Sequence, residues 1–371
     1  MKEQISSRKD VTLTITEACN LNCTYCYEEH KSKNEMSFET AKRIIDYELS
    51  VDDGKNQVTI DFFGGEPFMN FELIKEICQY TWSKEWPKQY IFFATTNGTL
   101  IHEEIANWIT ENKDRFWLGL SIDGNEYMQN INRCNSFSQV DLGYFLREWP
   151  EQAVKMTISK ETLPHLAEGC IFLHEKGFKV TCNLAYGLDW SDENSQKTLS
   201  HQLMKLIEYY VEHPTISPCS MLDRRIEGFV EKRPNFHKWC GAGTNMRVYS
   251  ITGEYYPCQF FMPLSVGSEK ASQSGKIDFE NDDILRDHMC DDCILLPICP
   301  TCYGSNYART GDISKKDKSE CEMNKLIILA NSYFRYRLLT KYTDEELGIS
   351  IQDRKCLTDA IVAIQNFLGA E

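Results

Sequence analysis

The stretch that organises this chain is residues 17–28, which read Glu-Ala-Cys-Asn-Leu-Asn-Cys-Thr-Tyr-Cys-Tyr-Glu. Cys19, Cys23 and Cys26 stand there at C-x3-C-x2-C spacing, just after an alternating run, 11–16, that predicts a β-strand. A short irregular loop lets several thiolates converge on one inorganic centre, and thiolates are the usual ligands of iron–sulfur clusters. Three cysteines leave one iron of a four-iron cluster open to a further ligand, much as a catalytic zinc keeps an open position. A zinc-binding or merely structural cysteine loop is the alternative for this motif taken alone.

The composition limits the class of protein. A chain of 371 residues suits a barrel-sized unit with an appendage. Its net charge of −15 argues against a nucleic-acid partner and against an anionic membrane surface, because both attract basic faces. Residues 1–10, MKEQISSRKD, lack the apolar core of a signal peptide, and no apolar run approaches transmembrane length. We therefore expect a cytoplasmic protein whose sixteen cysteines serve as metal ligands rather than as disulfides.

After the cysteine loop, segments with helical periodicity alternate with apolar, β-branched or aromatic runs. The predicted strands are 11–16, 57–63, 89–95, 115–122, 153–159 and 178–185, and the predicted helices are 37–50, 70–84, 101–112, 138–148, 162–176 and 192–213. This alternation indicates six βα units in an α/β fold with a parallel sheet and helical crossovers. Six units are fewer than the eight of a closed TIM barrel.

Shifts in composition divide the chain into four parts. We predict a first domain over 1–215, a bridge over 216–239, a cysteine-rich domain over 240–325 and C-terminal helices over 326–371. The bridge is a polar stretch punctuated by Pro214, Pro218 and Pro234.

A second motif, Gly64-Gly65-Glu66-Pro67, follows the predicted strand 57–63 and precedes a helix. Glycines let a backbone approach a ligand closely, and a carboxylate pairs with an ammonium group. Alone, this tetrapeptide is an ordinary βα turn. Placed one βα unit after the cysteine triad, it resembles the motif of the radical S-adenosylmethionine (SAM) superfamily that holds the amino group of SAM.

The resemblance has consequences for the fold and for the first cluster. It implies a partial (βα)6 barrel with an open side that admits a large substrate. It also implies a cluster on Cys19, Cys23 and Cys26, with the amino and carboxylate groups of SAM on the open iron.

Polar residues near the next strand ends match the superfamily more loosely. Asn97 follows the third predicted strand, and Ser121 and Asp123 close the fourth, where ligand contacts of parallel barrels gather. By resemblance Asn97 belongs to the SAM site, Ser121 contacts the ribose or methionine part, and Arg133 contacts the SAM carboxylate through its planar fork. Tyr25 occupies the aromatic position that packs near adenine. Helix or turn capping is the alternative for Asn97, Ser121 and Asp123, and a solvated surface charge is the alternative for Arg133.

The second half of the chain has the most specific pattern. A cysteine is followed by twelve residues, Gly253, four residues and a second cysteine, and then by the run C-x2-C-x5-C-x2-C and one more cysteine. These cysteines are Cys240, Cys258, Cys290, Cys293, Cys299, Cys302 and Cys321. The pattern resembles the SPASM domain of peptide- and protein-modifying radical SAM enzymes, which carries two auxiliary four-iron clusters. The family has three residues between its third and fourth clustered cysteines, where this chain has two. A zinc-ribbon-like structural element is the alternative.

This second resemblance implies two sets of ligands. Cys290, Cys293, Cys299 and Cys321 form the set for the outer cluster, auxiliary II. Cys240, Cys258 and Cys302 form the set for auxiliary I, nearer the barrel. No other cysteine lies between Cys240 and Cys258, so the fourth iron of auxiliary I is either open to a substrate thiolate or closed by Cys219 or a non-cysteine residue.

Cysteines outside the two patterns suit plainer roles. Cys78 and Cys170 lie in apolar helical contexts and suit small core residues. Cys219 suits a solvent-exposed cysteine of the bridge better than a ligand or a hydrogen-atom donor.

The resemblance covers about residues 11–325 and implies an enzyme. SAM and three [4Fe–4S] clusters are the implied cofactors, and flavodoxin or ferredoxin is the expected electron donor. The expected substrate is a ribosomally made precursor peptide that receives a cross-link, with a thioether favoured over a carbon–carbon bond. Only ten residues precede the first predicted strand, so we expect a separate leader-recognition protein or direct recognition of the core peptide.

Three alternatives differ in sequence requirements. A sulfatase-maturing enzyme, which makes formylglycine, places an aspartate base directly after the cysteine at position 258, whereas this chain has Gln259, which takes up no proton at neutral pH. A peptide epimerase is a second alternative. A non-catalytic iron–sulfur electron carrier is the third, and it has no need for the Gly64–Pro67 segment.

Overall fold

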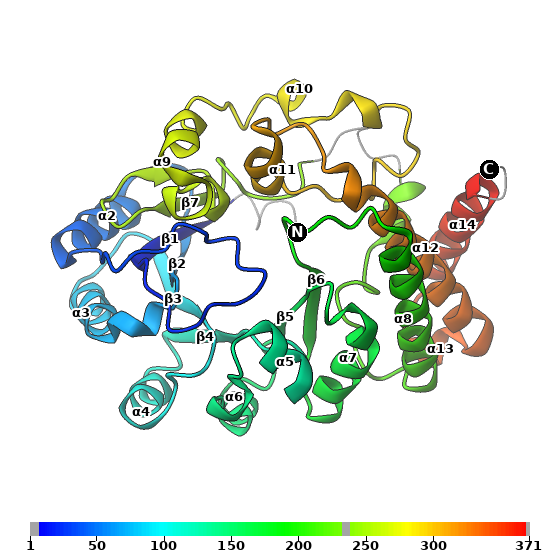
Figure 1. The fold of residues 1–371 in the computed structure, drawn as a ribbon, viewed down its shortest axis with the longest axis horizontal. Helices are drawn as coiled ribbons and strands as arrows, with labels where there is room; N and C mark the ends of the chain where they lie inside the picture. The colour runs from blue at the N-terminus through cyan, green and yellow to red at the C-terminus, as the bar shows by residue number, and fades with distance from the viewer. Residues whose placement is uncertain (1–6, 232–237, 369–371) are drawn as a thin grey trace.

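The computed structural model describes residues 7–231 and 238–368 (Figure 1). In chain order its strands and α-helices are β1 (Arg8–Thr16), α2 (Phe38–Ser50), β2 (Gln57–Gly64), α3 (Phe71–Trp82), β3 (Gln89–Thr96), α4 (Glu103–Glu111), β4 (Phe116–Leu120), α5 (Glu126–Asn132), α6 (Leu142–Glu148), β5 (Val154–Ile158), α7 (Leu166–Glu175), β6 (Val180–Leu184), α8 (Glu193–Glu212), β7 (Met246–Tyr249), β8 (Tyr255–Tyr256), α9 (Pro263–Ser274), α10 (Asp282–Leu285), α11 (Tyr303–Thr310), α12 (Lys318–Lys341), α13 (Asp344–Leu347) and α14 (Ile351–Leu368). Pro234 of the predicted bridge lies outside the described residues, as do residues 1–6.

The predicted alternation of strands and helices is confirmed. Every predicted strand is present, as β1 to β6, and each is followed by a helix. The helix predicted over 138–148 begins only at Leu142, because the Asp141 side chain caps it by accepting a hydrogen bond from the Tyr144 N–H at 3.1 Å. Helix α5 was not predicted, since seven residues are too few to establish a helical period.

The strands form one large parallel sheet and a small one. In the large sheet the order is β4-β3-β2-β1-β7-β8, with β1 to β4 and β7 parallel and β8 antiparallel to β7. Strands β5 and β6 pair separately in parallel, and the single bridge Ser121–Lys155 joins them to the end of β4. The parallel α/β fold is confirmed, and β7, from the cysteine-rich segment, extends the sheet of the first half.

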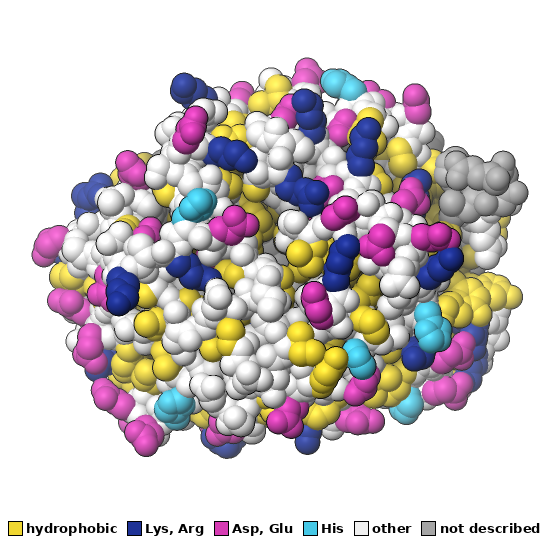
Figure 2. Space-filling view, in the orientation of Figure 1, with side chains coloured by type: hydrophobic (Ala, Val, Ile, Leu, Met, Phe, Trp, Pro, Cys, Tyr) yellow, Lys and Arg dark blue, Asp and Glu magenta, His cyan; other side chains and the backbone are white. Residues whose placement is uncertain are grey.

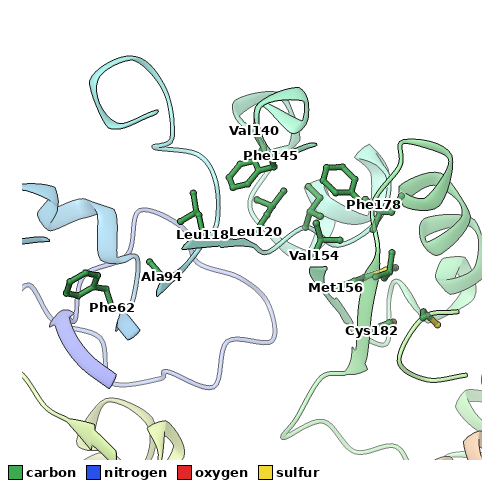
Figure 3. Close-up of a cluster of buried hydrophobic side chains, with 14 of the residues drawn as sticks. Phe62, Ala94, Leu118, Leu120, Val140, Phe145, Val154, Met156, Phe178 and Cys182 are labelled. Atoms are coloured by element: carbon green, nitrogen blue, oxygen red, sulfur yellow. The ribbon is translucent and has the colours of Figure 1, made fainter. Parts of the chain in front are cut away.

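The two faces of these strands differ in polarity. Val11, Leu13 and Ile15 of β1 are fully buried in the main core. Figure 3 shows side chains from β2 to β6 continuing this apolar layer, and these are Phe62, Ala94, Leu118, Leu120, Val154, Met156 and Cys182. Because side chains alternate along a strand, Thr12 and Thr14 of β1 face the opposite side. The helices therefore cover an apolar face, while the inner face has both polar and apolar side chains, such as Asp61 and Phe93.

The second half has hydrophobic clusters of its own. One cluster consists of buried residues drawn from between Ala242 and Ile313, among them Phe261 and Tyr303. Helix α12 begins at Lys318 and runs without a break to Lys341, so it crosses the predicted boundary between residues 325 and 326. It packs against α8 of the first half.

A buried ionic network also ties the second half to the sheet. Lys9 of β1 is 1% exposed and donates hydrogen bonds to Glu48 of α2 and, at 2.7 Å, to Asp53. Glu48 also accepts hydrogen bonds from Arg247, at 3.1 Å, and from the Tyr249 hydroxyl, both on β7. Buried charges are tolerated when they are paired in this way.

The surface carries both signs of charge. Figure 2 shows acidic and basic side chains interspersed over one face, with scattered apolar groups between them. Within the described part of the chain, no helix combines the length and apolar content needed to cross a bilayer.

Candidate functional site

The loop after β1 brings the three N-terminal cysteines together. Cys19, Cys23 and Cys26 are half-buried, and burial raises the pKa of the Cys19 thiol to about 11 and that of Cys23 to about 12. The charge of Cys26 contributes to both shifts and that of Cys19 contributes to the shift of Cys23, so the three thiols lie within electrostatic range of one another. The Lys31 ammonium lies 3.1 Å from the Cys26 sulfur.

The zinc alternative for the cysteine loop requires several ligands around one ion. Thiolates bound to one Zn²⁺ at about 2.3 Å lie within about 4 Å of each other. Among the residues that the structure describes, no three His, Cys, Asp or Glu side chains are placed to hold a single metal ion.

The glycines of the second motif allow it to lie directly on the cysteine loop. A Cβ atom added to Gly64 would stand 1.9 Å from the Thr16 carbonyl oxygen, and one added to Gly65 would stand 2.3 Å from that of Ala18 and 2.8 Å from the Cys19 Cβ. The Glu66 N–H donates to the Ala18 carbonyl at 2.9 Å. Pro67 then begins a short 3-10 helix. The two sequence motifs therefore form one continuous surface.

Glu66 is a buried carboxylate at this surface. It is 1% exposed, and it accepts hydrogen bonds from the Thr96 hydroxyl and the Asn97 N–H, both at 2.8 Å. Burial nevertheless raises its pKa to about 7. A cationic ligand would stabilise the charged form of this carboxylate.

Asn97 and Ser121 lie at adjacent strand ends. The Asn97 side chain donates to the Asn20 side chain at 2.9 Å and accepts from the Thr99 N–H at 3.0 Å, so it joins the cysteine loop to the turn after β3. The half-buried Ser121 donates its N–H to the Thr96 carbonyl at 2.9 Å. Asn97 therefore has the capping contacts that the sequence left open as an alternative.

Asp123 is the centre of a buried polar network. Arg133 donates to it through Nε at 2.9 Å and through Nη2 at 3.2 Å, and the Tyr25 hydroxyl also donates to it. The Thr157 N–H donates to it at 2.9 Å, and the Asn132 side-chain amide at 3.2 Å. Arg133 is only 8% exposed, so the alternative of a solvated surface charge is wrong.

The end of α5 holds the cysteine loop from the other side. The Thr24 N–H donates to the Asn132 carbonyl at 3.0 Å. Cys134 accepts from the Asn22 N–H at 3.3 Å and donates to the Asn22 carbonyl at 3.1 Å. Sequence reasoning missed this contact, because no local pattern links residues 22 and 134.

Comparison with known proteins decides the family. Residues 13–201 match the family model of the Radical SAM superfamily. The chain belongs to the radical SAM superfamily.

Individual relatives are more distant or match only a part of the chain. The protein MJ0907 of Methanocaldococcus jannaschii is 43% identical over 181 residues, which are 47% of this chain and 62% of that protein. A cysteine-type anaerobic sulfatase-maturating enzyme of Clostridium perfringens strain 13 is 25% identical over 66% of this chain and 72% of its own length. The subtilosin biosynthesis protein AlbA of Bacillus subtilis is 26% identical over 67% of this chain and 54% of its own length.

A solved structure shares the fold. The structure of anSMEcpe with bound AdoMet superposes with a TM-score of 0.69 at 20% identity, over 89% of this chain and 98% of that one. The likeness extends beyond the residues that the family model matches.

Membership of the radical SAM superfamily makes this chain a radical SAM enzyme, with SAM and one [4Fe–4S] cluster as cofactors. The described residues fit both groups. Three converging thiols suit the cluster, and the buried Glu66 carboxylate suits an ammonium group. When bound, these cofactors supply a 5′-deoxyadenosyl radical, and the chain itself contributes orientation and exclusion of water.

The cysteines of the second half gather into two groups. Hairpin β7–β8 turns at Gly253, whose φ is +83°, and brings Cys258 toward Cys302. Burial raises the pKa of Cys258 above its usual range and that of Cys302 to about 11, and the charge of Cys240 adds to both shifts. A Cβ atom added to Gly304 would stand 3.2 Å from the Cys258 sulfur, so the chain passes close to this group.

The other group lies near the start of α12. Burial raises the pKa of Cys290 to about 11, with contributions from the charges of Cys321 and Cys299, and Cys321 in turn lies within electrostatic range of Cys299 and Cys293. The Lys316 ammonium lies 3.5 Å from the Cys299 sulfur. The two groups have the same members as the two ligand sets expected from the sequence.

An aromatic stack links the first cysteine loop to the second half. Tyr27, next to Cys26, stacks on Phe260 with ring centroids 4.2 Å apart, and Phe260 follows Cys258 by two residues. Tyr27 lies within electrostatic range of both Cys258 and Cys302. The sequence signal for this contact was weak, an aromatic residue one position after Cys26 and another two positions after Cys258.

Cys219 differs from its expectation. It is fully buried and interacts with Cys170, which in turn interacts with Cys182. The expected solvent exposure of Cys219 is wrong, because the bridge folds back onto β6 and donates the Ser220 N–H to the Val180 carbonyl. Cys78 and Cys170 are fully buried, as expected of core residues.

Proposed function

We propose that this radical SAM enzyme is a maturase that modifies a ribosomally made peptide, and that it carries two auxiliary four-iron clusters. The observation that carries the proposal is the grouping of seven cysteines from residues 240–321 into two sets. Cys240, Cys258 and Cys302 are the proposed ligands of auxiliary I. Cys290, Cys293, Cys299 and Cys321 are the proposed ligands of auxiliary II.

The proposed architecture follows the same division as the sequence. Residues 1–215 form a partial (βα)6 barrel, 216–239 a bridge, 240–325 a SPASM domain and 326–371 the C-terminal helices, with α12 running across the last of these boundaries. Six parallel strands in chain order support the barrel, and the separate hydrophobic cluster of residues 242–313 supports the second domain.

The proposed product is a cross-link, with a thioether favoured over a carbon–carbon bond. The relative AlbA takes part in the biosynthesis of a bacteriocin, which supports a peptide substrate. The similarity to sulfatase-maturating enzymes supports a second candidate function, formylglycine formation, as strongly as AlbA supports the first. A flavodoxin or ferredoxin is the proposed electron donor, and a separate leader-recognition protein is a proposed partner.

Iron content tests the cluster assignment. Three four-iron clusters predict about twelve iron atoms per anaerobically reconstituted chain. Replacing Cys19, Cys23 and Cys26 with alanine should remove about a third of the iron and abolish formation of 5′-deoxyadenosine. Cys219→Ala is the matched control. It should leave the iron content unchanged, because Cys219 is buried against Cys170 and not among the proposed iron ligands. Iron near four atoms in the unsubstituted protein would refute the auxiliary clusters.

Peptide modification tests the function itself. The reconstituted enzyme, SAM and a reductant should change the mass of a peptide encoded beside its gene. A loss of two hydrogens without cleavage is expected for a cross-link. Conversion of a cysteine to formylglycine would favour the second candidate.

A further inference from the structure

One layer of side chains on the inner face of the strands combines a carboxylate and a hydroxyl with two aromatic rings. Strand pairing aligns Thr12 of β1 with Asp61 of β2, Asp61 with Phe93 of β3, and Phe93 with Trp117 of β4. A closed TIM barrel fills such layers with bulky branched side chains. A carboxylate in this layer therefore differs from the usual apolar filling, and a buried carboxylate needs a hydrogen-bond or ion-pair partner.

A cavity of about 570 Å³ opens at this layer. Asp61, Thr12 and Phe93 line it, and so does Gln259, the residue that follows Cys258. The cavity thus connects the inner face of the sheet with the neighbourhood of the proposed auxiliary I ligands.

Asp61 has an unused acceptor in this cavity. Its Oδ1 atom is buried and accepts no hydrogen bond from the residues that the structure describes. The Thr12 hydroxyl interacts with the carboxylate, and the charged groups that act on it are Lys155, which favours its ionised form, and Asp10, which opposes it. Burial is the largest influence and raises the pKa of Asp61 to about 7.

Lys155 faces the carboxylate from β5 without neutralising it by direct contact. Its ammonium donates to the Thr95 hydroxyl at 2.8 Å. Burial lowers its pKa, and the charge of Asp61 partly offsets that shift. The Asp61 carboxylate therefore lines the cavity, and Lys155 acts on it through its charge from outside the lining.

The relation between Asp61 and Gln259 bears on the chemistry. A glutamine at position 259 provides no base, but the same cavity has a carboxylate on the facing strand β2. A base in this cavity is compatible with both candidate products, since each requires that a thiol or hydroxyl lose its proton.

We propose that Asp61 is the proton acceptor for the peptide substrate in this cavity. The inference rests on the proposed peptide-modifying function. In the step, a substrate C–H hydrogen leaves as an atom to the 5′-deoxyadenosyl radical, and the S–H or O–H proton leaves to the Asp61 carboxylate. The one remaining electron would pass to one of the proposed auxiliary four-iron clusters. The substrate has then lost two hydrogens and gained one C–S bond, or one C=S or C=O double bond.

The test separates hydrogen abstraction from proton transfer. The probe is a synthetic cysteine peptide that is deuterated on carbon, incubated with the reconstituted holoenzyme, SAM and dithionite. Deuterium in 5′-deoxyadenosine reports abstraction, and the mass of the peptide reports product. Asp61→Asn should lower product formation about 100-fold or more, the range of a general base, while deuterium transfer changes less than about twofold. Asp61→Glu should restore part of the product.

The pH profile and a control variant complete the design. Product formation by the unsubstituted enzyme should rise with pH through about 7, the pKa of Asp61, because the carboxylate form accepts the proton. The control is Asp223→Asn, whose side chain is 60% exposed, pairs with Arg335 and does not line this cavity, and it should leave product formation within about twofold.

Equal product from Asp61→Asn and the unsubstituted enzyme overturns the proposal, and so does an equal loss of deuterium transfer and product, which indicates a structural role. Carbon-13 labelling of aspartate should show an Asp61 signal that titrates near pH 7, and titration below pH 5 also overturns the proposal. If Asp61 titrates near 7 but no deuterium leaves the peptide, the proposed function fails and this inference fails with it.

Discussion

Arg133 and Asp123 form a two-pronged buried ion pair, with Nε and Nη2 of the guanidinium 2.9 and 3.2 Å from the two carboxylate oxygens. Asp123 is fully buried and also accepts the Tyr25 hydroxyl. The sequence predicted that Arg133 contacts the SAM carboxylate. In the structure, two of its guanidinium nitrogens, Nε and Nη2, already donate to Asp123. Arg133 positions Tyr25, one residue before Cys26, through this shared carboxylate.

Removing one partner of this pair should be costly. Arg133→Ala leaves an uncompensated buried carboxylate, and we expect a loss of about 3–5 kcal/mol in the free energy of unfolding, measured by urea titration of the anaerobic holoenzyme. Arg225→Ala is the control, since that side chain is 61% exposed, and should change the free energy by less than about 0.5 kcal/mol. Similar values for the two variants would contradict the role of the ion pair.

Glu66→Gln should weaken SAM binding without loss of iron. Replacing a charge-assisted hydrogen bond by a neutral one should cost about 1.5–3 kcal/mol, which is about a 10- to 150-fold increase in Kd, measured by equilibrium dialysis of labelled SAM. The matched control is Glu104→Gln on α4, whose side chain is 76% exposed. An unchanged Kd for Glu66→Gln would mean that the SAM ammonium lies elsewhere.

Gly65→Ala should disturb the close packing of the Gly64–Pro67 segment on the loop that carries Cys19. The new methyl group would stand 2.3 Å from the Ala18 carbonyl oxygen, so the backbone must shift, and overpacking of this kind costs about 1–3 kcal/mol. We expect lower thermal stability and less iron per chain. Gly275→Ala is the control, because its φ is −65° and its Cβ position is open. Full iron content in Gly65→Ala would show that the close approach is not needed.

Asp61 predicts a dependence of stability on pH. Its pKa is about 7 in the folded protein and 3.8 in the reference state, so the folded state binds more protons between these values and loses stability as pH rises through that window. The Asp61→Asn side chain does not ionise, so the variant should not lose this stability as the pH rises. We expect the variant to have a higher Tm than the unsubstituted protein at pH 8, and about the same Tm at pH 4.

A carboxylate with the opposite shift provides the control for that measurement. Lys160 and Ser195 hold the pKa of Asp192 at about 2, so its charge stabilises the folded state above the reference value. Asp192→Asn should therefore lower the Tm at pH 8 rather than raise it. An Asp61→Asn variant that is less stable at pH 8 would contradict the burial argument.

Local sequence determined the elements and the two N-terminal motifs. Alternation over 11–16 and the periodicity of 37–50 each depend on neighbouring residues, and both correspond to observed elements, β1 and α2. The spacing of Cys19, Cys23 and Cys26 within one short loop leaves little freedom for the thiols to separate. Glycines at 64 and 65 likewise mark a close approach of the backbone before the partner is known.

Only the tertiary structure decided which distant residues meet. Strand register placed Asp61 beside Thr12 and in the cavity with Gln259, although 198 positions separate Asp61 from Gln259 in the chain. The burial of Arg133 against Asp123, and of Cys219 against Cys170, also depends on how helices and the bridge pack on the strands. These contacts join segments whose separation carries no periodic signal, so the sequence alone specified the chemical groups and the packing of the sheet specified their partners.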